Sequence, residues 1–238
     1  MLFKKLSSEL KSGIQKKADK SQVSSMKRYF RETINPIGVK HPVIRKITMD
    51  FYKLHKEELD FKTTVDICEN LLKTGVYEFG IAAFNLFQKH EKEFDKNTAL
   101  LIEKWISKYV SNWAFCDILC PKSMGFLISH HPSLINTLKK WAVSKNLWLR
   151  RASIVSFVII SRKKDCAKEV IPITKLLLND KEDLVHKATG WTLREAAKAN
   201  KPAILAFLRK HKLKLPRTAL RYAIEHFSDA EKKELMKT

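Results

Sequence analysis

The sequence predicts an all-α protein: an α-solenoid of HEAT-like helical repeats that forms a curved superhelix. Three observations predict this class. Apolar residues recur at the three- and four-residue spacing of amphipathic helices, with short breaks between the helices. The alternating pattern and turn dipeptides that mark strands are absent. Four segments also recur at a near-constant step, which is the signature of stacked helix pairs.

The recurring segments are heptapeptides that begin at residues 77, 113, 148 and 184, so the steps between them are 36, 35 and 36 residues. They read YEFGIAA, WAFCDIL, WLRRASI and LVHKATG. Each heptapeptide is expected to begin the second helix of a repeat. Repeats of this kind must stack in order to bury their apolar faces. The second helices are therefore expected to line the concave face of the superhelix.

The predicted helix boundaries carry residues that suit the start of a helix. Proline is best tolerated in the first turn, and Asn, Asp and Ser side chains cap free backbone N–H groups. The expected first-turn prolines are Pro42, Pro132, Pro202 and Pro216, and the expected N-caps are Asn97, Asp165 and Ser228. No linker or break in composition divides the chain, which predicts a single HEAT-like repeat domain over residues 1–238. Residues 1–50 fit the period less well and are expected to be N-terminal capping helices.

The composition excludes several classes of protein. No apolar run approaches the ~20 residues of a membrane-spanning helix, and the first residues predict an amphipathic helix, not a signal peptide. There is no glycine-rich loop, which excludes the dinucleotide-binding and P-loop folds. The four cysteines fit no common disulfide framework and are expected to be reduced, half-buried thiols of a cytosolic protein. The histidines form no ligand pattern, so no metal is expected.

The net charge is +21, from 46 lysines and arginines against 25 aspartates and glutamates. Between Glu195 and Glu225 there is no acidic residue, and the cations of that stretch are Lys198, Lys201, Arg209, Lys210, Lys212, Lys214, Arg217 and Arg221. So long an acid-free stretch in a basic protein favours nucleic acid as the partner. A solvated, solubilising face is the simpler interpretation. An anionic membrane surface is a further alternative, which would need a bulky apolar face beside the lysines.

Asp117 departs from the repeat pattern. The fifth position of the four heptapeptides holds Ile81, Asp117, Ala152 and Ala188. A carboxylate at a packed position is costly unless it is paired or partly hydrated. Asp117 is therefore expected either to serve chemistry or to form a structural salt bridge with an arginine of a neighbouring repeat.

Aromatic and basic residues accompany Asp117 on the predicted second helices. Trp113 and Asp117 are one helical turn apart, so both project from the same stripe. The residues expected to cluster along one side are Trp113, Trp148, Arg150, Arg151, His186, Lys187 and Trp191. Trp148 is also interpretable as a core residue, as are Trp105 and Trp141. One of the two adjacent arginines, Arg150 or Arg151, is expected to bond the next repeat.

Several stretches carry a family resemblance. They are RYF from Arg28, IGVKHP from Ile37, NWAFCD from Asn112, NLWLRRA from Asn146 and KATGWTLRE from Lys187. With these stretches in order along nearly the whole chain, the sequence resembles the DNA alkylation repair enzymes, the AlkD-like DNA glycosylases with HEAT-like repeats. The family can carry aromatic residues just before the Trp191 helix, where this chain has Asp183 and Leu184.

The resemblance implies a monofunctional DNA N-glycosylase that removes cationic alkylated purines, such as N3-methyladenine and N7-methylguanine, from duplex DNA in base excision repair. It implies that Trp113, Asp117 and Arg151 are the catalytic positions. The residues expected to bind DNA are Tyr29, Lys40, Arg150, Lys187, Trp191, Arg194, Lys210, Lys212 and Lys214.

The same resemblance implies no metal or organic cofactor, and a cytoplasmic monomer that associates with the nucleoid when it is bound to DNA. No membrane partner is expected. The alternative function is that of a non-catalytic HEAT-repeat scaffold or nucleic-acid-binding protein. An RNA-binding regulator would also suit the charge, but it would not account for the family stretches.

Overall fold

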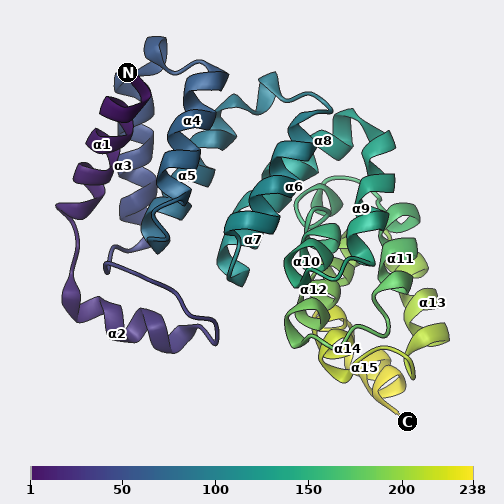
Figure 1. Ribbon diagram of the computed structural model, residues 1–238. Coiled ribbons are helices and arrows are strands. Elements are labelled where there is room, and N and C mark those ends of the chain that lie inside the picture. The colour runs from purple at the N-terminus through teal and green to yellow at the C-terminus, as the bar shows by residue number, and fades with distance from the viewer. Residues whose placement is uncertain (1, 238) are drawn as a thin grey trace. The chain divides into compact units, whose positions relative to one another are not determined.

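A computed structural model describes residues 2–237, and all regular structure in this range is helical, from α1 to α15 (Figure 1). The predicted all-α class is confirmed. The chain divides into two compact units. Unit 1 comprises residues up to 95 together with 108–119, and unit 2 comprises residues 96–107 together with those from 120 onward.

Unit 1 is built around one apolar helix. Its α-helices are α1 (Leu2–Gln15), α2 (Lys20–Tyr29), α3 (His41–Leu54), α4 (Phe61–Leu72), α5 (Tyr77–Phe87) and α7 (Trp113–Leu119). Helix α5 is buried along almost its whole length, as expected of a helix that is apolar on all sides. It packs against α3, α4 and α7, and α1 packs against α3 and α4. Helices α3, α5 and α7 therefore form one row, and α1 and α4 form a second row behind it.

Unit 2 repeats the same two-row arrangement. Its α-helices are α6 (Thr98–Tyr109, whose last turn belongs to unit 1), α8 (Gly125–His130), α9 (Ile135–Ala142), α10 (Leu147–Val155), α11 (Ala167–Leu176), α12 (Asp183–Ala199), α13 (Lys201–His211), α14 (Arg217–Ala223) and α15 (Asp229–Met236). Helix α12 packs between α10 and α14, while α11 packs between α9 and α13. Such layered helix pairs are the arrangement of HEAT-like repeats.

Short helical segments link these helices. Four are 3₁₀ segments, at Lys56–Glu58 (η1), Gln88–Glu93 (η2), Pro132–Leu134 (η4) and Ile160–Arg162 (η5), and one is a π-helical turn, Cys120–Met124 (η3). No helix among residues 2–237 is both long enough and apolar enough to cross a membrane.

The predicted repeat coincides with the observed helices. Helices α5 and α7 begin at the first residue of their heptapeptides, and α10 and α12 begin one residue earlier. At the fifth position, Ile81, Ala152 and Ala188 are 1%, 0% and 0% exposed. Asp117 is only half-buried. The prediction that the fifth position is packed in three repeats, and that Asp117 departs from this pattern, is confirmed.

The predicted prolines lie at helix starts. Pro42, Pro132 and Pro202 lie in the first turns of α3, η4 and α13, as expected, whereas Pro216 is the N-cap residue of α14 and precedes its first turn. Ser228 forms a capping box with Glu231 at the start of α15. Asp165 accepts a hydrogen bond from the N–H of Ala167 at the start of α11, and Asn97 precedes α6.

Two expectations about buried side chains need correction. The four cysteines are free thiols but fully buried, not half-buried, because each lies within the helix packing. Trp148 is partly exposed and is not a core residue, whereas Trp105 and Trp141 are buried as expected. Trp148 lies near the start of α10, where the helix is less enclosed.

The contact between α12 and α14 depends on Gly190, which gives a first prediction. A Cβ atom there would lie 2.4 Å from the carbonyl oxygen of Ala219. Gly190→Ala is expected to destabilise the protein by about 1–3 kcal/mol because backbone must move to accommodate the methyl group. The measurement is the urea dependence of helical circular dichroism.

Gly13→Ala is the matched control. Gly13 lies inside α1, and its added Cβ would be 3.5 Å from Ile47 Cγ2, an ordinary contact. This variant is expected to gain roughly 0.5–1 kcal/mol from the lower flexibility of alanine in the unfolded chain. Equal stabilities for the two variants would contradict the proposed close packing of α12 on α14.

Candidate active site

Unit 1 contains a pocket of about 600 Å³ between α2, α5 and α7. Trp113 and Asp117 both line it, as their shared stripe on α7 predicts. Tyr29 and Lys40 line it as well. The structure therefore brings four of the predicted site residues together within one unit. Asp117 is the only carboxylate among the described lining residues.

The pocket is rich in aromatic rings around Trp113. Phe30 stacks on the Trp113 indole with ring centroids 5.1 Å apart and planes at 17°. Tyr29 meets the same indole edge-on at 5.7 Å, and its side chain remains 74% exposed. Phe30 also contacts Tyr77 at 5.4 Å. Such ring pairs contribute about 0.5–1.5 kcal/mol each beyond simple burial, so they hold the end of α2 against α5 and α7.

His41 and Tyr77 form a polar pair on the pocket wall. The His41 Nε2 atom lies 2.8 Å from the Tyr77 hydroxyl. Burial lowers the pKa of His41, opposed by the charge of Glu78, so the imidazole is neutral near pH 7. Burial, together with the Glu78 charge, raises the pKa of Tyr77. The phenol therefore stays protonated and donates its O–H to His41 Nε2.

Glu78 holds the segment between α2 and α3. Its side chain is fully buried, at 0% exposure. One carboxylate oxygen accepts the N–H of Ile37 at 2.9 Å, and the other accepts those of Gly38 and Val39 at 2.8 and 3.0 Å. Consecutive backbone N–H groups that converge in this way form an anion-binding nest. The buried charge is thus neutralised by backbone dipoles.

Gly38 makes this nest possible. Its φ is +91°, a conformation that favours glycine, and a Cβ there would lie 2.0 Å from the carbonyl oxygen of Asp19. The N–H of Asp19 donates to the carbonyl of Ile37 at 3.2 Å, and the N–H of Tyr77 donates to that of Asn35 at 3.0 Å. Hydrogen bonds therefore join the two ends of the segment 19–37, which contains α2, and attach this segment to the start of α5.

Sequence reasoning missed Glu78, although a signal for it existed. The second position of the heptapeptides holds Glu78, Ala114, Leu149 and Val185, so a carboxylate interrupts an apolar column there too. Phe30 and His41 lie within the family stretches RYF and IGVKHP, but neither was singled out, because their roles depend on contacts with residues far away in the sequence.

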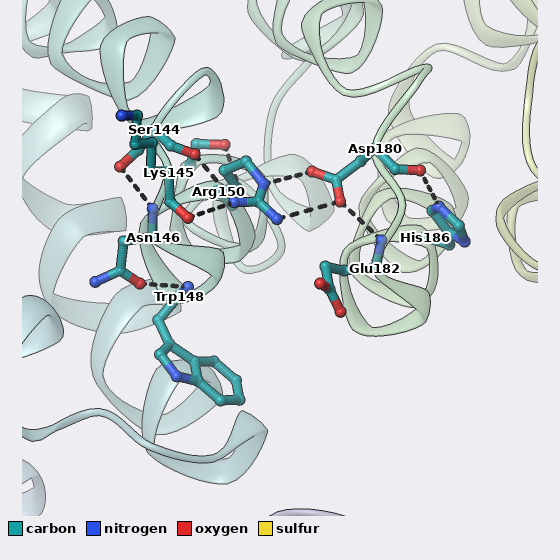
Figure 2. Close-up of polar contacts among 9 residues, drawn as sticks. Ser144, Lys145, Asn146, Trp148, Arg150, Asp180, Glu182 and His186 are labelled. Atoms are coloured by element: carbon teal, nitrogen blue, oxygen red, sulfur yellow. Dashed lines mark hydrogen bonds and ion pairs between the residues drawn. The ribbon is translucent and has the colours of Figure 1, made fainter.

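In unit 2, Arg150 fixes the loop before α12 (Figure 2). Its Nε atom donates to the Asp180 carboxylate at 2.6 Å, and its Nη1 atom donates to the carbonyls of Ser144 and Lys145 at 3.0 Å. His186 bonds the carbonyl oxygen of Asp180 at 2.6 Å. In Figure 2 the Trp148 indole points away from this network. Arg150 is thus a bond to the next repeat, and a role in DNA binding stays a prediction.

Arg151 contacts the same repeat. It is 4% exposed and donates to the carbonyl of Leu184 in α12. Both arginines, and not one, therefore reach the neighbouring repeat. Arg151 belongs to unit 2, so its predicted grouping with Trp113 and Asp117 stays a prediction.

The predicted DNA-binding residues of α12 have mixed environments. Trp191 is partly exposed. Lys187 pairs with Asp183 at 2.9 Å, one turn earlier in the helix. Arg194 pairs with Glu225 and with Glu195. The charge of Arg194 is therefore largely compensated within unit 2.

Helix α15 compensates much of the acid-free stretch. Lys201 bonds Glu231 at 2.8 Å, and with Ser228 it lowers the pKa of Glu231 to about 2. Arg209 bonds Glu234 through two nitrogens, at 2.7 and 2.8 Å. Lys212 donates to the carbonyl of Lys237 at 2.9 Å. The stretch is acid-free in sequence but not in space.

Lys210 and Lys214 are exposed, and neither side chain forms an ion pair with another residue in 2–237. They lie near His211. Burial lowers the pKa of His211, and the charges of Lys175, Lys210 and Lys214 lower it further. This part of unit 2 is therefore an uncompensated positive region. No group of three or more His, Cys, Asp or Glu side chains in the described part of the chain is arranged to hold a metal ion.

The fold and the pocket define a basic helical-repeat protein with an aromatic, carboxylate-bearing site. A sequence model described as DNA alkylation repair enzyme matches residues 10–227. The chain therefore belongs to the DNA alkylation repair enzyme family.

One solved structure is described as a predicted DNA alkylation repair enzyme from Enterococcus faecalis. It is 16% identical in sequence, covers 90% of this chain and 98% of its own, and aligns with a TM-score of 0.79. At this identity the similarity shows a shared fold. No curated protein matches the chain.

The Glu78 nest gives a second prediction. Glu78→Gln replaces an acceptor oxygen with an amide that faces backbone N–H groups, so at least one buried donor loses its partner. The expected loss of unfolding free energy is about 1–3 kcal/mol for each unpaired donor, measured in urea. Glu57→Gln, at an exposed position, is the control and should change stability by less than about 0.5 kcal/mol. An unchanged midpoint for Glu78→Gln would argue against the nest.

Proposed function

We propose that this protein is a monofunctional DNA N-glycosylase that hydrolyses the glycosidic bond of cationic alkylated purines, N3-methyladenine and N7-methylguanine among them, in base excision repair. Membership of the DNA alkylation repair enzyme family supports the repair role. The observation that carries the reaction is the single carboxylate of Asp117, one turn from Trp113 in an aromatic pocket.

The chemistry needs few groups, because the leaving base already carries a positive charge. Its departure requires no general acid, and positive charge moves onto the sugar in the transition state. Asp117 stabilises that charge and orients or deprotonates the attacking water. Its half-buried position suits both roles, since Asp117 lines the pocket and is not fully buried.

The aromatic rings favour a cationic substrate over a neutral one. A cation is attracted to the face of an aromatic ring by about 0.5–2 kcal/mol, more when it is desolvated. Phe30 holds Trp113 by stacking on it, and Tyr29 offers an exposed ring beside it. Lys40 lines the same pocket, and we propose that it binds a phosphate of the DNA strand.

We propose that residues of unit 2 bind the DNA backbone. Arg151, the third catalytic position implied by the family resemblance, is proposed to act on a phosphate near the lesion. Trp191 is proposed to contact the nucleotide chain, with Lys210 and Lys214 on more distant phosphates. No metal or cofactor is needed, and the enzyme is proposed to act as a cytoplasmic monomer on the nucleoid.

A non-catalytic HEAT-repeat scaffold or nucleic-acid-binding protein is the alternative. It accounts for the net charge of +21 and for the helical repeats. It does not account for Asp117, because a protein that only binds phosphates gains nothing from a carboxylate in its pocket.

Asp117→Asn tests the reaction. The substitution keeps the size of the side chain and removes its charge. We expect release of 7-methylguanine from methylated duplex DNA to slow by about 10²-fold or more under single-turnover conditions. DNA affinity should hold or rise, because an anion is lost from a surface that faces phosphates.

Asp180→Asn is the matched control. Asp180 is the 4%-exposed partner of Arg150 in unit 2. Its substitution should lower the melting temperature, since it leaves a half-buried arginine without its partner, while the folded fraction keeps the parental excision rate. A well-folded Asp117→Asn protein that releases the base at the parental rate would remove Asp117 from the mechanism.

The basic stretch of unit 2 gives a further test. Replacing Lys210, Lys212 and Lys214 together with alanine is expected to weaken binding to all duplex sequences alike. The slope of log K against log salt should fall by roughly 0.9 for each lost phosphate contact. Lys212→Ala alone should lower the melting temperature and leave the slope unchanged, because Lys212 bonds carbonyls near the C-terminus. An unchanged slope in the triple variant would make these lysines merely solubilising.

A further inference from the structure

Residues 20–31, which contain α2, carry four cations and no acidic residue: Lys20, Lys27, Arg28 and Arg31. All four side chains are exposed. Among residues 2–237, none of them forms a side-chain hydrogen bond or an ion pair. We name this set the α2 cationic face.

Helix α2 has two opposite faces. Gln22, Met26 and Tyr29 line the pocket. At 100° per residue, Lys20 and Lys27 share a stripe on the other side of the helix, with Arg28 next to it. The side of α2 that carries Met26 and Tyr29 is therefore turned toward the pocket, and the side that carries Lys20 and Lys27 is turned away from it. Arg31 lies just beyond the end of the helix. A membrane-surface helix would need its apolar side chains outward beside the cations.

The helix contributes nothing to the core of unit 1. None of its residues is buried, and Figure 1 shows it set apart from α1, α3, α4 and α5. It is held at its ends. Asp19 caps it and bonds Ile37, Glu78 closes the returning loop, and Phe30 packs on Trp113. A helix that is fixed so firmly, yet buries no side chain, is suited to contact a partner.

The cations of α13 provide a contrast within the same chain. Lys201 and Arg209 are bonded to glutamates of α15, and Lys212 is bonded to backbone carbonyls there. A cation that is already paired gains less from a phosphate, because the existing bond must be broken first. The α2 cationic face has no such bonds to lose.

We propose that the α2 cationic face binds the phosphate backbone of duplex DNA. It does so next to the pocket that holds Trp113 and Asp117, and this placement rests on the proposed function. Charge complementarity selects the partner: the four unpaired cations outnumber the flanking carboxylates of Asp19 and Glu32 and match a regular array of phosphates.

The test compares two variants with equal loss of charge. The first is Lys27→Gln, Arg28→Gln and Arg31→Gln; the second is Lys201→Gln, Arg209→Gln and Lys212→Gln. Binding to an undamaged duplex is measured by fluorescence anisotropy across a salt series. The α2 variant is expected to lower the slope of log K against log salt by about 2.7, or 0.9 for each phosphate. The second variant should lower it by less than about 1.

Equal slopes for the two variants would overturn the proposal, because only net charge would then matter. Circular dichroism and melting temperature confirm that each variant is folded. Vesicles that contain phosphatidylserine provide a further arm. Vesicle binding by the parent protein that the α2 variant loses would assign the face to a membrane and overturn the proposal as well.

Excision is followed separately. It is measured as the single-turnover rate at saturating protein, so that weaker binding by the α2 variant does not limit it. If the parent protein binds duplex DNA through α2 but releases no base, the proposed glycosylase activity is wrong. The proposal for DNA binding by α2 would still hold.

Discussion

The candidate site depends on the burial of one carboxylate, that of Glu78. A fully buried charge is tolerated only when hydrogen bonds compensate it, and the N–H groups of Ile37, Gly38 and Val39 provide them. This requirement fixes the loop between α2 and α3. Residues that reach the pocket flank the loop on both sides: Tyr29 and Phe30 before it, and Lys40 and His41 after it. Without the nest, the ring contacts and the backbone hydrogen bonds of Asp19 and Tyr77 alone would have to position α2.

The charge of the protein is distributed differently in space and in sequence. The stretch between Glu195 and Glu225 is acid-free in sequence, yet Glu231 and Glu234 of α15 return to bond its cations. The four cations of residues 20–31, by contrast, form no ion pair with other residues in 2–237. A surface that attracts phosphates is set by the charges left unpaired after folding, and these differ from the charges counted along a chain.

Two positions of the aligned heptapeptides hold a carboxylate in one repeat and an apolar residue in the other three, and the two carboxylates have different environments. Asp117 and Glu78 both replace an apolar residue in an aligned column, and the pattern identifies each as exceptional. Their environments differ because of contacts that the pattern does not contain. Asp117 is half-buried and lines the pocket, whereas Glu78 is enclosed by backbone from a loop about 40 residues earlier. Asp117 is therefore placed at the pocket, whereas Glu78 holds the loop between α2 and α3.

The sequence by itself determined the all-helical class, the repeat and its register, the helix starts and the pairing of Trp113 with Asp117 on one stripe. The helices, their starts and the Trp113–Asp117 pair depend on residues within one or two helical turns, where spacing alone fixes the geometry. The repeat follows from the recurrence of one pattern every 35 or 36 residues. Only the tertiary structure decided that Phe30 stacks on Trp113, that His41 bonds Tyr77, that Arg150 is bonded to Asp180 and that α15 neutralises part of the basic stretch. Each of these contacts joins residues about 25 to 85 positions apart, and such contacts form only when stacking of the repeats brings separate helices together.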